Sequence, residues 1–301
     1  MRIVRTVTSY ARLVRAPNLF TAPPDVLLGG ALVAGAGTDI DGGVLAVLAF
    51  GSICLYAAGT TLNDYFDVAE DTRERPGRPI PAGDISQPSA FAFGLVLLVG
   101  GIAISAVAGG RWSGGIAGGL AVCILLYDGV FKGGAVGFLF MGGARGLNVL
   151  LGVSLAGPVV DQPAATLAVP AVVLTYIAAV TYLAEGETGG GNPKAIGIAS
   201  GAVVLASLAV VWRVGAKPPS TAGIILSLTL AFGFLLWTGR ALRRAYVTLQ
   251  PSVIGSAIGT CVLAQVVLDA AFAATVTPLW GFAVLCFLLP AVGLATLFDI
   301  S

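Results

Sequence analysis

The sequence predicts an all-α membrane protein, built as a polytopic bundle of transmembrane helices. Of its 301 residues, 57% are hydrophobic and only 10% are charged, whereas a soluble domain carries roughly 25% charged residues. Apolar runs of about 20 residues recur from end to end, and a run of this length crosses a bilayer as a helix. The runs do not alternate between polar and apolar residues as barrel strands do, which favours helices over a barrel.

The apolar runs predict about nine or ten transmembrane helices. Pro278 separates the last two runs and Pro290 interrupts the final one, so these runs count as one helix or two. Residues 1–301 are expected to form a single integral-membrane domain, and the 42 glycines suit close packing of its helices. The expected spans lie near residues 19–37, 44–64, 89–109, 112–131, 135–157, 165–185, 195–214, 220–238, 253–275 and 279–298.

The lysines and arginines predict how the chain is oriented. If the N-terminus is cytoplasmic, the outer loops hold only Arg111, Arg213 and Lys217. Positive charge accumulates on the cytoplasmic side of membrane proteins. The loops at 65–88 and 186–194 are then expected in the cytoplasm, and the chain in the inner (plasma) membrane of a cell. The basic residues on the inner side are Arg2, Arg5, Arg12, Arg15, Arg73, Arg75, Arg78, Lys132, Lys194, Arg240, Arg243 and Arg244.

The composition also excludes several kinds of site and partner. A net charge of +1 gives no reason to expect nucleic-acid binding. The absence of histidine removes the commonest general base and the usual zinc ligand. Cys54, Cys123, Cys261 and Cys286 lie singly within apolar runs, which indicates buried thiols rather than disulfides or a metal cluster. Any metal is therefore expected to have mainly oxygen ligands.

Acidic residues gather directly after the second predicted span, in the segment "NDYFDVAED". On a helix, Asp64, Asp67 and Asp71 would share one face, with Asn63 beside them. Carboxylates held this close repel one another unless a cation lies between them. Hard oxygen ligands favour Mg²⁺, which commonly binds through one or two carboxylates and the phosphates of a substrate. The alternative is a solvated charged loop at a helix end.

Basic residues follow at once in the segment "RPGRPIPAG". Its prolines are expected to end the helix, and Arg75 and Arg78 come with them. The guanidinium group matches phosphate oxygens with two parallel hydrogen bonds. Carboxylates for Mg²⁺ beside arginines for phosphate predict a diphosphate site, and the membrane location predicts a lipid substrate.

Two further residues end the fourth span on the same side, in "LLYDGVFK". Lys132 is expected to contact phosphate, and the alternative is that it extends to the membrane surface. Tyr127 is expected to line the substrate site, although an aromatic residue at the membrane interface is the common alternative. Near the start of the chain, Asn18 precedes the first span, where it either lines the cavity or caps a helix.

An arginine within a span is a candidate functional residue because a charge inside a membrane is costly. Arg145 lies about ten residues into the fifth span, and Asn148 follows it on the same helical face. We expect Arg145 to act in catalysis and Asn148 to bind substrate. The alternative is a structural pair between Arg145 and a buried acid, for which Asp25 and Asp269 are the candidates.

The segment "NDYFDVAED…RPGRPIPAG" resembles the first aspartate-rich motif of the UbiA superfamily of intramembrane prenyltransferases. The resemblance implies an all-helical fold, usually of nine transmembrane helices, and Mg²⁺-dependent transfer of a prenyl group from its diphosphate. It implies that Asn63 and the three aspartates hold Mg²⁺-diphosphate. It also implies that Arg75 and Arg78 contact phosphate.

The second motif departs from this pattern. Most of the superfamily has D-x-x-x-D at the end of the sixth span, where this chain has "TYLAEGETGGGNPK". Leu183 stands at the first aspartate position and Glu187 at the second, with Glu185 between them. Residues two apart do not share a helical face, so Glu187 is expected to be the functional carboxylate of this motif, as a Mg²⁺ ligand or as a partner of a phosphate-binding arginine. A single glutamate followed by glycines is similar to the EboC branch of the superfamily.

The sequence therefore predicts a Mg²⁺-dependent prenyltransferase. Its partners are an isoprenoid diphosphate, a small acceptor of unknown identity and membrane lipid, without nucleic acid. One alternative is a UbiA-type terpene cyclase, in which the prenyl chain attacks itself and no acceptor is needed. The other is a non-catalytic protein that binds or transports an isoprenoid lipid, for which clustered carboxylates would have no purpose.

Overall fold

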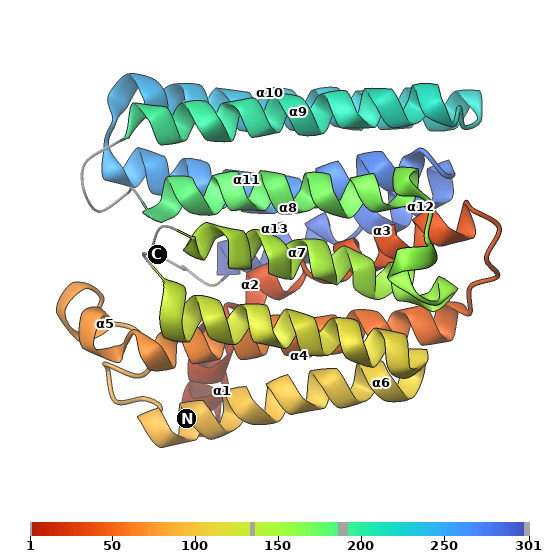
Figure 1. The fold of residues 1–301 in the computed structure, drawn as a ribbon. Helices are drawn as coiled ribbons and strands as arrows, with labels where there is room; N and C mark the ends of the chain where they lie inside the picture. Colours follow the sequence, from red (N-terminus) through yellow and green to blue (C-terminus); the bar gives the residue numbers. More distant parts are fainter. Residues whose placement is uncertain (1, 133–135, 186–191, 298–301) are drawn as a thin grey trace.

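The computed structural model describes residues 2–132, 136–185 and 192–297, and in these ranges every regular element is helical. Figure 1 shows the helices stacked in layers, with α9 and α10 on one side of the bundle and α4 and α6 on the other. The helices are α1 (Arg2–Leu13), α2 (Ala16–Leu19), α3 (Pro23–Ala34), α4 (Gly42–Phe66), α5 (Val68–Glu74), α6 (Gln87–Leu126), α7 (Gly137–Val153), α8 (Ala164–Glu185), α9 (Pro193–Ala216), α10 (Thr221–Thr248), α11 (Pro251–Ala274), α12 (Pro278–Leu285) and α13 (Leu288–Leu297).

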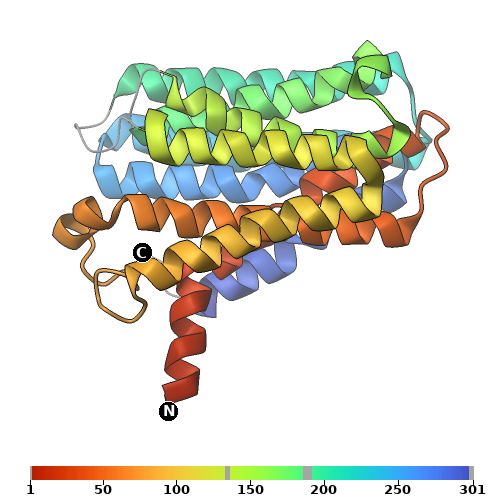
Figure 2. The ribbon, with the colours of Figure 1, turned by 60° about the horizontal axis from the view of Figure 1, so that its bottom comes forward.

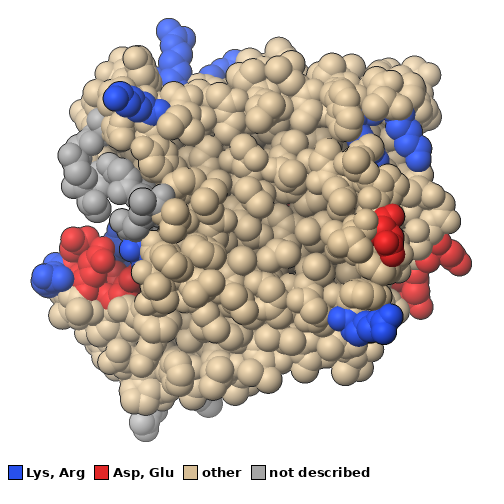
Figure 3. All heavy atoms as spheres, in the orientation of Figure 1, with Lys and Arg blue, Asp and Glu red and all other residues tan. Residues whose placement is uncertain are grey.

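The predicted membrane bundle is confirmed. Within the described ranges, 7 helices are long and apolar enough to cross a membrane, and they are α4, α6 with its continuation to Phe131, and α7 to α11. Figure 3 shows lysine, arginine, aspartate and glutamate gathered at the two ends of the bundle, with an uncharged belt between them. An apolar belt between charged ends is the surface that a bilayer requires.

Helix α6 contains two of the predicted spans. Gly110 has φ 77° and ψ −167°, which interrupts the helix where the sequence predicts a boundary between 89–109 and 112–131. Positive φ strains residues that carry a Cβ atom, and glycine has none. Figures 1 and 2 show the chain turning back at this point. The two arms of α6 therefore count as separate crossings.

The first and last predicted spans are shorter than expected. The first becomes α3, whose 12 residues rise about 18 Å, against about 30 Å for the hydrocarbon core of a bilayer. The last is broken into α12 and α13 after Leu285. Pro290 lies in the first turn of α13, because only there does a helix tolerate a proline without losing a hydrogen bond. Apolar composition alone does not reveal these breaks.

Helix α3 packs against α4, α7 and α11 in the interior of the bundle. Its crossing with α7 is so close that a Cβ atom on Gly29 would lie 2.1 Å from the carbonyl oxygen of Val149. A Cβ atom on Gly152 would lie 2.0 Å from the carbonyl oxygen of Val26. Small residues let two membrane helices approach in this way. The crossing brings the polar residues of α3 and α7 into direct contact.

Candidate functional site

The predicted acidic segment forms the junction between α4 and α5. Helix α4 ends at Phe66, Asp67 has a turn conformation (φ −86°, ψ 1°), and α5 begins at Val68. The helical hydrogen bonds continue across the junction, since the N–H of Asp67 donates to the carbonyl of Asn63 (3.0 Å) and that of Asp71 to the carbonyl of Asp67 (2.8 Å). The aspartates therefore remain close together, at the end of the bundle where Figure 1 shows α5.

Arg78 joins the first and last of these aspartates. One of its nitrogens, Nη1, donates to Asp64 Oδ1 at 3.1 Å and to Asp71 Oδ2 at 2.6 Å. Both carboxylates are nearly buried, with side-chain exposures of 6% and 2%. Burial strengthens this contact and makes an unpaired carboxylate costly. Arg75 lies farther away, with Nη1 3.8 Å from Asp71 Oδ1.

Arg15 is a site residue that the sequence did not single out. It lies just before α2 with φ 50°, and its Nη2 contacts Asp64 Oδ1 at 3.2 Å and Asn63 Oδ1 at 3.4 Å. Burial opposes the charge of Arg15, but the acidic groups around it, Asp64 first and then Tyr56 and Asp128, together outweigh this cost and raise the pKa of the guanidinium above its ordinary value. The only signal in the sequence was its position before the first span.

The residues after α6 form the other wall of the site. Tyr127–Phe131 make a turn of π-helix, a distortion that is frequent at functional sites. Asp128 in this turn is buried and accepts a hydrogen bond from Asn63 Nδ2 at 2.9 Å. Lys132 pairs with Asp67 through its Nζ atom. The sequence predicted Lys132 but not Asp128, although the two lie in the same quoted segment.

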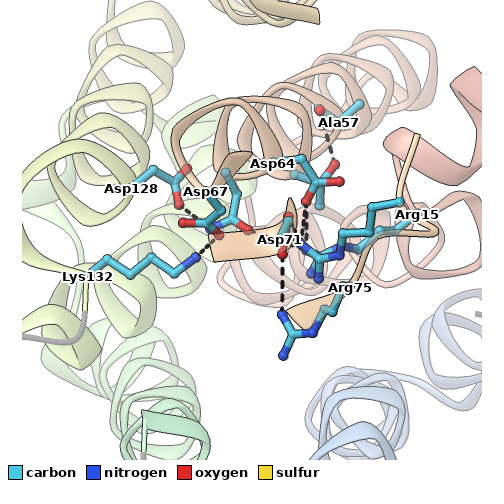
Figure 4. A network of polar contacts seen from close by, with 11 residues as sticks. Arg15, Ala57, Asp64, Asp67, Asp71, Arg75, Asp128 and Lys132 are labelled. Carbon is cyan, nitrogen blue, oxygen red and sulfur yellow. Dashed lines mark hydrogen bonds and ion pairs between the residues drawn. The ribbon is translucent and has the colours of Figure 1, made fainter. Parts of the chain in front are cut away.

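Figure 4 shows Asp64, Asp67 and Asp71 with cationic side chains around them. Among the described residues, no three Asp, Glu, Cys or His side chains are grouped as a set of metal ligands. Mg²⁺ needs fewer, because one or two carboxylates and substrate phosphates suffice. Asp64 and Asp71 both reach one nitrogen atom of Arg78, and Asp71 Oδ1 is buried without a hydrogen-bond partner. These oxygen donors fit Mg²⁺.

Arg145 and Asn148 are not part of this cluster of charges. They lie on α7 in the interior of the bundle, where both donate to Asp25 Oδ2 at 2.8 Å. Arg145 also donates to the carbonyl of Thr21 at 2.8 Å, and Asn148 to the carbonyl of Ala22 at 2.9 Å. The observed arrangement is thus the alternative that the sequence offered, a buried pair between Arg145 and Asp25.

The remaining predicted residues lie in different places. Asn18 is within α2, and its carbonyl accepts a hydrogen bond from the Thr21 hydroxyl at 2.8 Å. The residue that caps α2 is Arg15, so Asn18 does not have the capping position. Tyr127 begins the π-helical turn and is half-buried. Glu187 lies outside the described residues.

The family model for UbiA prenyltransferases matches residues 26–188. Two digeranylgeranylglyceryl phosphate synthases are similar over shorter segments. That of Methanopyrus kandleri is 39% identical over 99 residues, which cover 33% of this chain and 35% of the relative. That of Methanococcoides burtonii is 50% identical over 48 residues, 16% of this chain and 17% of the relative. The matched segments thus span about a third of these relatives or less.

The fold is similar to solved structures over nearly the whole chain. A UbiA homolog from Archaeoglobus fulgidus bound to GPP and Mg²⁺ superposes with a TM-score of 0.64 at 16% identity, covering 92% of this chain and 99% of that one. The structure of a UbiA homolog from Aeropyrum pernix superposes with a TM-score of 0.63 at 15% identity, covering 84% and 96%. Because the family model covers more than half of the sequence, the chain belongs to the UbiA prenyltransferase family.

Proposed function

We propose that this chain is a Mg²⁺-dependent prenyltransferase, which moves a prenyl group from an isoprenoid diphosphate to a small acceptor within the membrane. The observation that carries the proposal is the cluster of carboxylates and cations at one end of an apolar bundle. Three further findings support it. The chain belongs to the UbiA family, the similar curated proteins are digeranylgeranylglyceryl phosphate synthases, and a structural relative is bound to GPP and Mg²⁺.

The carboxylates and the cations have different tasks in this proposal. Asp64, Asp67 and Asp71 are the residues that would hold Mg²⁺, with Glu187 as a further ligand and Asn63 beside them. Bound Mg²⁺ would neutralise negative charge on the leaving diphosphate. The oxygen-only donor set supports this assignment, as does Asp71 Oδ1, which accepts no hydrogen bond from the described residues.

The arginines and the lysine would bind the diphosphate. In the structure Arg78, Arg15 and Lys132 pair with the aspartates. When substrate enters, these side chains exchange a carboxylate for a phosphate oxygen, and Arg75, whose carboxylate contact is the longest, is the most available. Positioned positive charge of this kind stabilises a leaving group as its bond breaks.

The other predicted residues have supporting places in this scheme. Tyr127 and Asn18 are proposed to border the substrate, since they belong to the segments that carry Lys132 and Arg15. Arg145 and Asn148 are proposed to act from the interior, because they hold the carbonyls of Thr21 and Ala22, close after α2 in the chain. These hydrogen bonds hold in place the segment of the chain that carries Arg15.

We also propose that the site faces the cytoplasm and that the chain resides in the plasma membrane as one domain. The excess of lysine and arginine on the loops at the acidic end supports this orientation. The loop at 75–86 lies at this end, after α5 and before α6.

The experiment that tests the function measures diphosphate release by the purified protein with prenyl diphosphates. We expect release that requires Mg²⁺ and that falls at least tenfold, about 1.4 kcal/mol, in Asp64→Asn. Asp161→Asn is the matched control, because this exposed aspartate lies between α7 and α8, away from the site. The absence of release with any prenyl diphosphate would contradict the proposal, and a cyclised product without acceptor would identify a cyclase.

A further inference from the structure

Among the described residues of the bundle, the carboxyl group of Asp269 is buried and has no hydrogen-bond donor. Asp269 on α11 has an exposure of 0%, and both of its carboxyl oxygens lack a partner. Gln265 lies one helical turn earlier with an exposure of 0%, and its Oε1 atom also lacks a partner. A buried charge without donors is among the costliest features of a folded protein. How the protein accommodates the carboxyl group of Asp269 therefore needs an explanation.

Only a few titratable groups face Asp269. It interacts electrostatically with Asp25 of α3 and Arg145 of α7, and with Tyr176 of α8. The described parts of α12 and α13 contain no titratable residue. The titratable residues of α9 and α10 lie near the ends of these helices. Within the described residues, Asp25 is thus its acidic neighbour and Arg145 its cationic one.

Asp25 is surrounded by donors and can accept one more hydrogen bond. Its Oδ2 atom accepts from Arg145 Nη1 at 2.8 Å and from Asn148 Nδ2 at 2.8 Å. Its Oδ1 atom accepts from Gln265 Nε2 at 2.7 Å. A carboxylate has about four lone pairs, so Oδ1 retains one. Three donors, one of them a guanidinium, stabilise Asp25 in its ionised form.

The charges of this cluster decide the state of Asp269. Ionised Asp25 and Arg145 form a neutral pair at 2.8 Å. A second ionised aspartate would leave one uncompensated negative charge in the membrane interior, which is strongly unfavourable. A protonated Asp269 removes that charge and also provides an O–H donor for the remaining lone pair of Asp25.

We propose that Asp269 is a proton-binding site. It holds a proton as a neutral carboxylic acid and donates it to Asp25, so that α3 and α11 are joined by a carboxylic acid–carboxylate hydrogen bond. A proton suits this place better than a metal cation, which needs several oxygen ligands around it, because most of the acceptor capacity of Asp25 is already used. This inference does not depend on whether the chain transfers prenyl groups.

Infrared spectroscopy of the purified protein tests the proposal directly. We expect the carbonyl band of a protonated carboxylic acid that persists at about pH 8 and disappears at this pH in Asp269→Asn. This variant should keep its melting temperature within about 2 °C, because the amide also donates to Asp25. Asp25→Asn is the comparison, and it should lower the melting temperature by at least about 5 °C because it leaves Arg145 unpaired.

Three results would overturn the proposal: no protonated-carboxyl band in the wild-type protein, loss of stability in Asp269→Asn as large as in Asp25→Asn, or stabilisation by Na⁺ over choline that Asp269→Asn abolishes. If Asp269→Asn does not fold, the band is measured in an Asp128→Asn background. Asp128 is the other buried carboxyl group to which the described residues give no ion pair. A band that persists there supports the proposal, and its loss overturns it.

Discussion

At the scale of single residues, Arg78 has the most consequential contacts, because one of its nitrogens reaches both Asp64 and Asp71. We expect Arg78→Ala to lower kcat/KM for diphosphate release at least tenfold, about 1.4 kcal/mol of transition-state stabilisation. The matched control is Arg73→Ala, since Arg73 is exposed and, among the described residues, its side chain bonds within its own helix, to the carbonyl of Ala69. This control should change kcat/KM by less than about twofold. Equal losses would trace the effect to net charge rather than to the position of Arg78.

The contact between Asn63 and Asp128 gives a second prediction. Asn63 Nδ2 donates to Asp128 at 2.9 Å and joins α4 to the turn that follows α6. In a double-mutant cycle with alanine at both positions, we expect a coupling energy of about 0.5–3 kcal/mol in kcat/KM. The same cycle between Asn63 and exposed Asp161 should be additive within about 0.5 kcal/mol. Additivity in the first cycle would remove Asp128 from the site.

The sequence predicted Arg78, whose partners lie nearby in the chain, and missed Arg15 and Asp128, whose partners are distant. Lys132 is 65 residues from its partner Asp67, and it was predicted from its place at the end of the fourth span. Helical spacing placed the aspartates together, and Arg78 follows Asp71 after 7 residues. Arg15 reaches Asp64 across 49 residues, and Asn63 reaches Asp128 across 65. Tertiary packing alone sets these contacts. For the same reason the sequence identified Asp25 as a candidate partner of Arg145 but could not distinguish it from the other candidate, Asp269.

At the scale of helices, the crossing of α3 and α7 depends on two glycines. A Cβ atom at Gly152 would meet the Val26 carbonyl at 2.0 Å and the Gly30 nitrogen at 2.7 Å. These are backbone atoms, so the helices themselves must separate. We expect Gly152→Ala to lower the free energy of unfolding by about 1–3 kcal/mol, measured by thermal unfolding in detergent. Gly201→Ala on α9 has open space at its Cβ position and should not destabilise the protein. Similar stability of the two variants would contradict the close crossing.

A helix boundary was predictable where the residues at the boundary themselves determine the backbone conformation. The break in α6 lies at a glycine with positive φ, between two apolar runs. The short α3 and the divided α12–α13 element were not predictable from apolar runs, because hydrophobicity continues across their ends. The same holds for the junction at Asp67, where the helical hydrogen bonds continue although the conformation changes.

At the scale of the whole molecule, the two ends of the bundle should lie on opposite sides of the membrane. Ala82 is exposed in the loop that follows the acidic segment, and Val160 is 87% exposed between α7 and α8. In a Cys286→Ser background, an impermeant thiol reagent should label Ala82→Cys only from the cytoplasmic side and Val160→Cys only from the outside. Labelling of both from the same side would contradict the arrangement of the helices, and reversed labelling would contradict the orientation.

The fold class was predictable at this scale from composition, since a chain with 10% charged residues can hide its apolar surface only in lipid. The packing of α3 against both α7 and α11 was not, because apolar helices of similar length offer many equivalent arrangements. Specific contacts select one arrangement, such as the glycine crossing of α3 and α7 and the pairing of a few buried polar side chains.

Because the charged residues at the acidic end are already paired with one another, a charged ligand binds there by replacing these internal ion pairs. Each aspartate already has a counter-ion from the protein, so the site's own charges nearly cancel and it attracts few ions from solution. Under the proposed function, loading Mg²⁺-diphosphate exchanges partners instead of adding charge, and salt should weaken binding less than at an open basic surface. When diphosphate leaves, the arginines and the lysine return to their carboxylates. Competition from these internal partners favours departure of the product, a step that limits turnover in many enzymes.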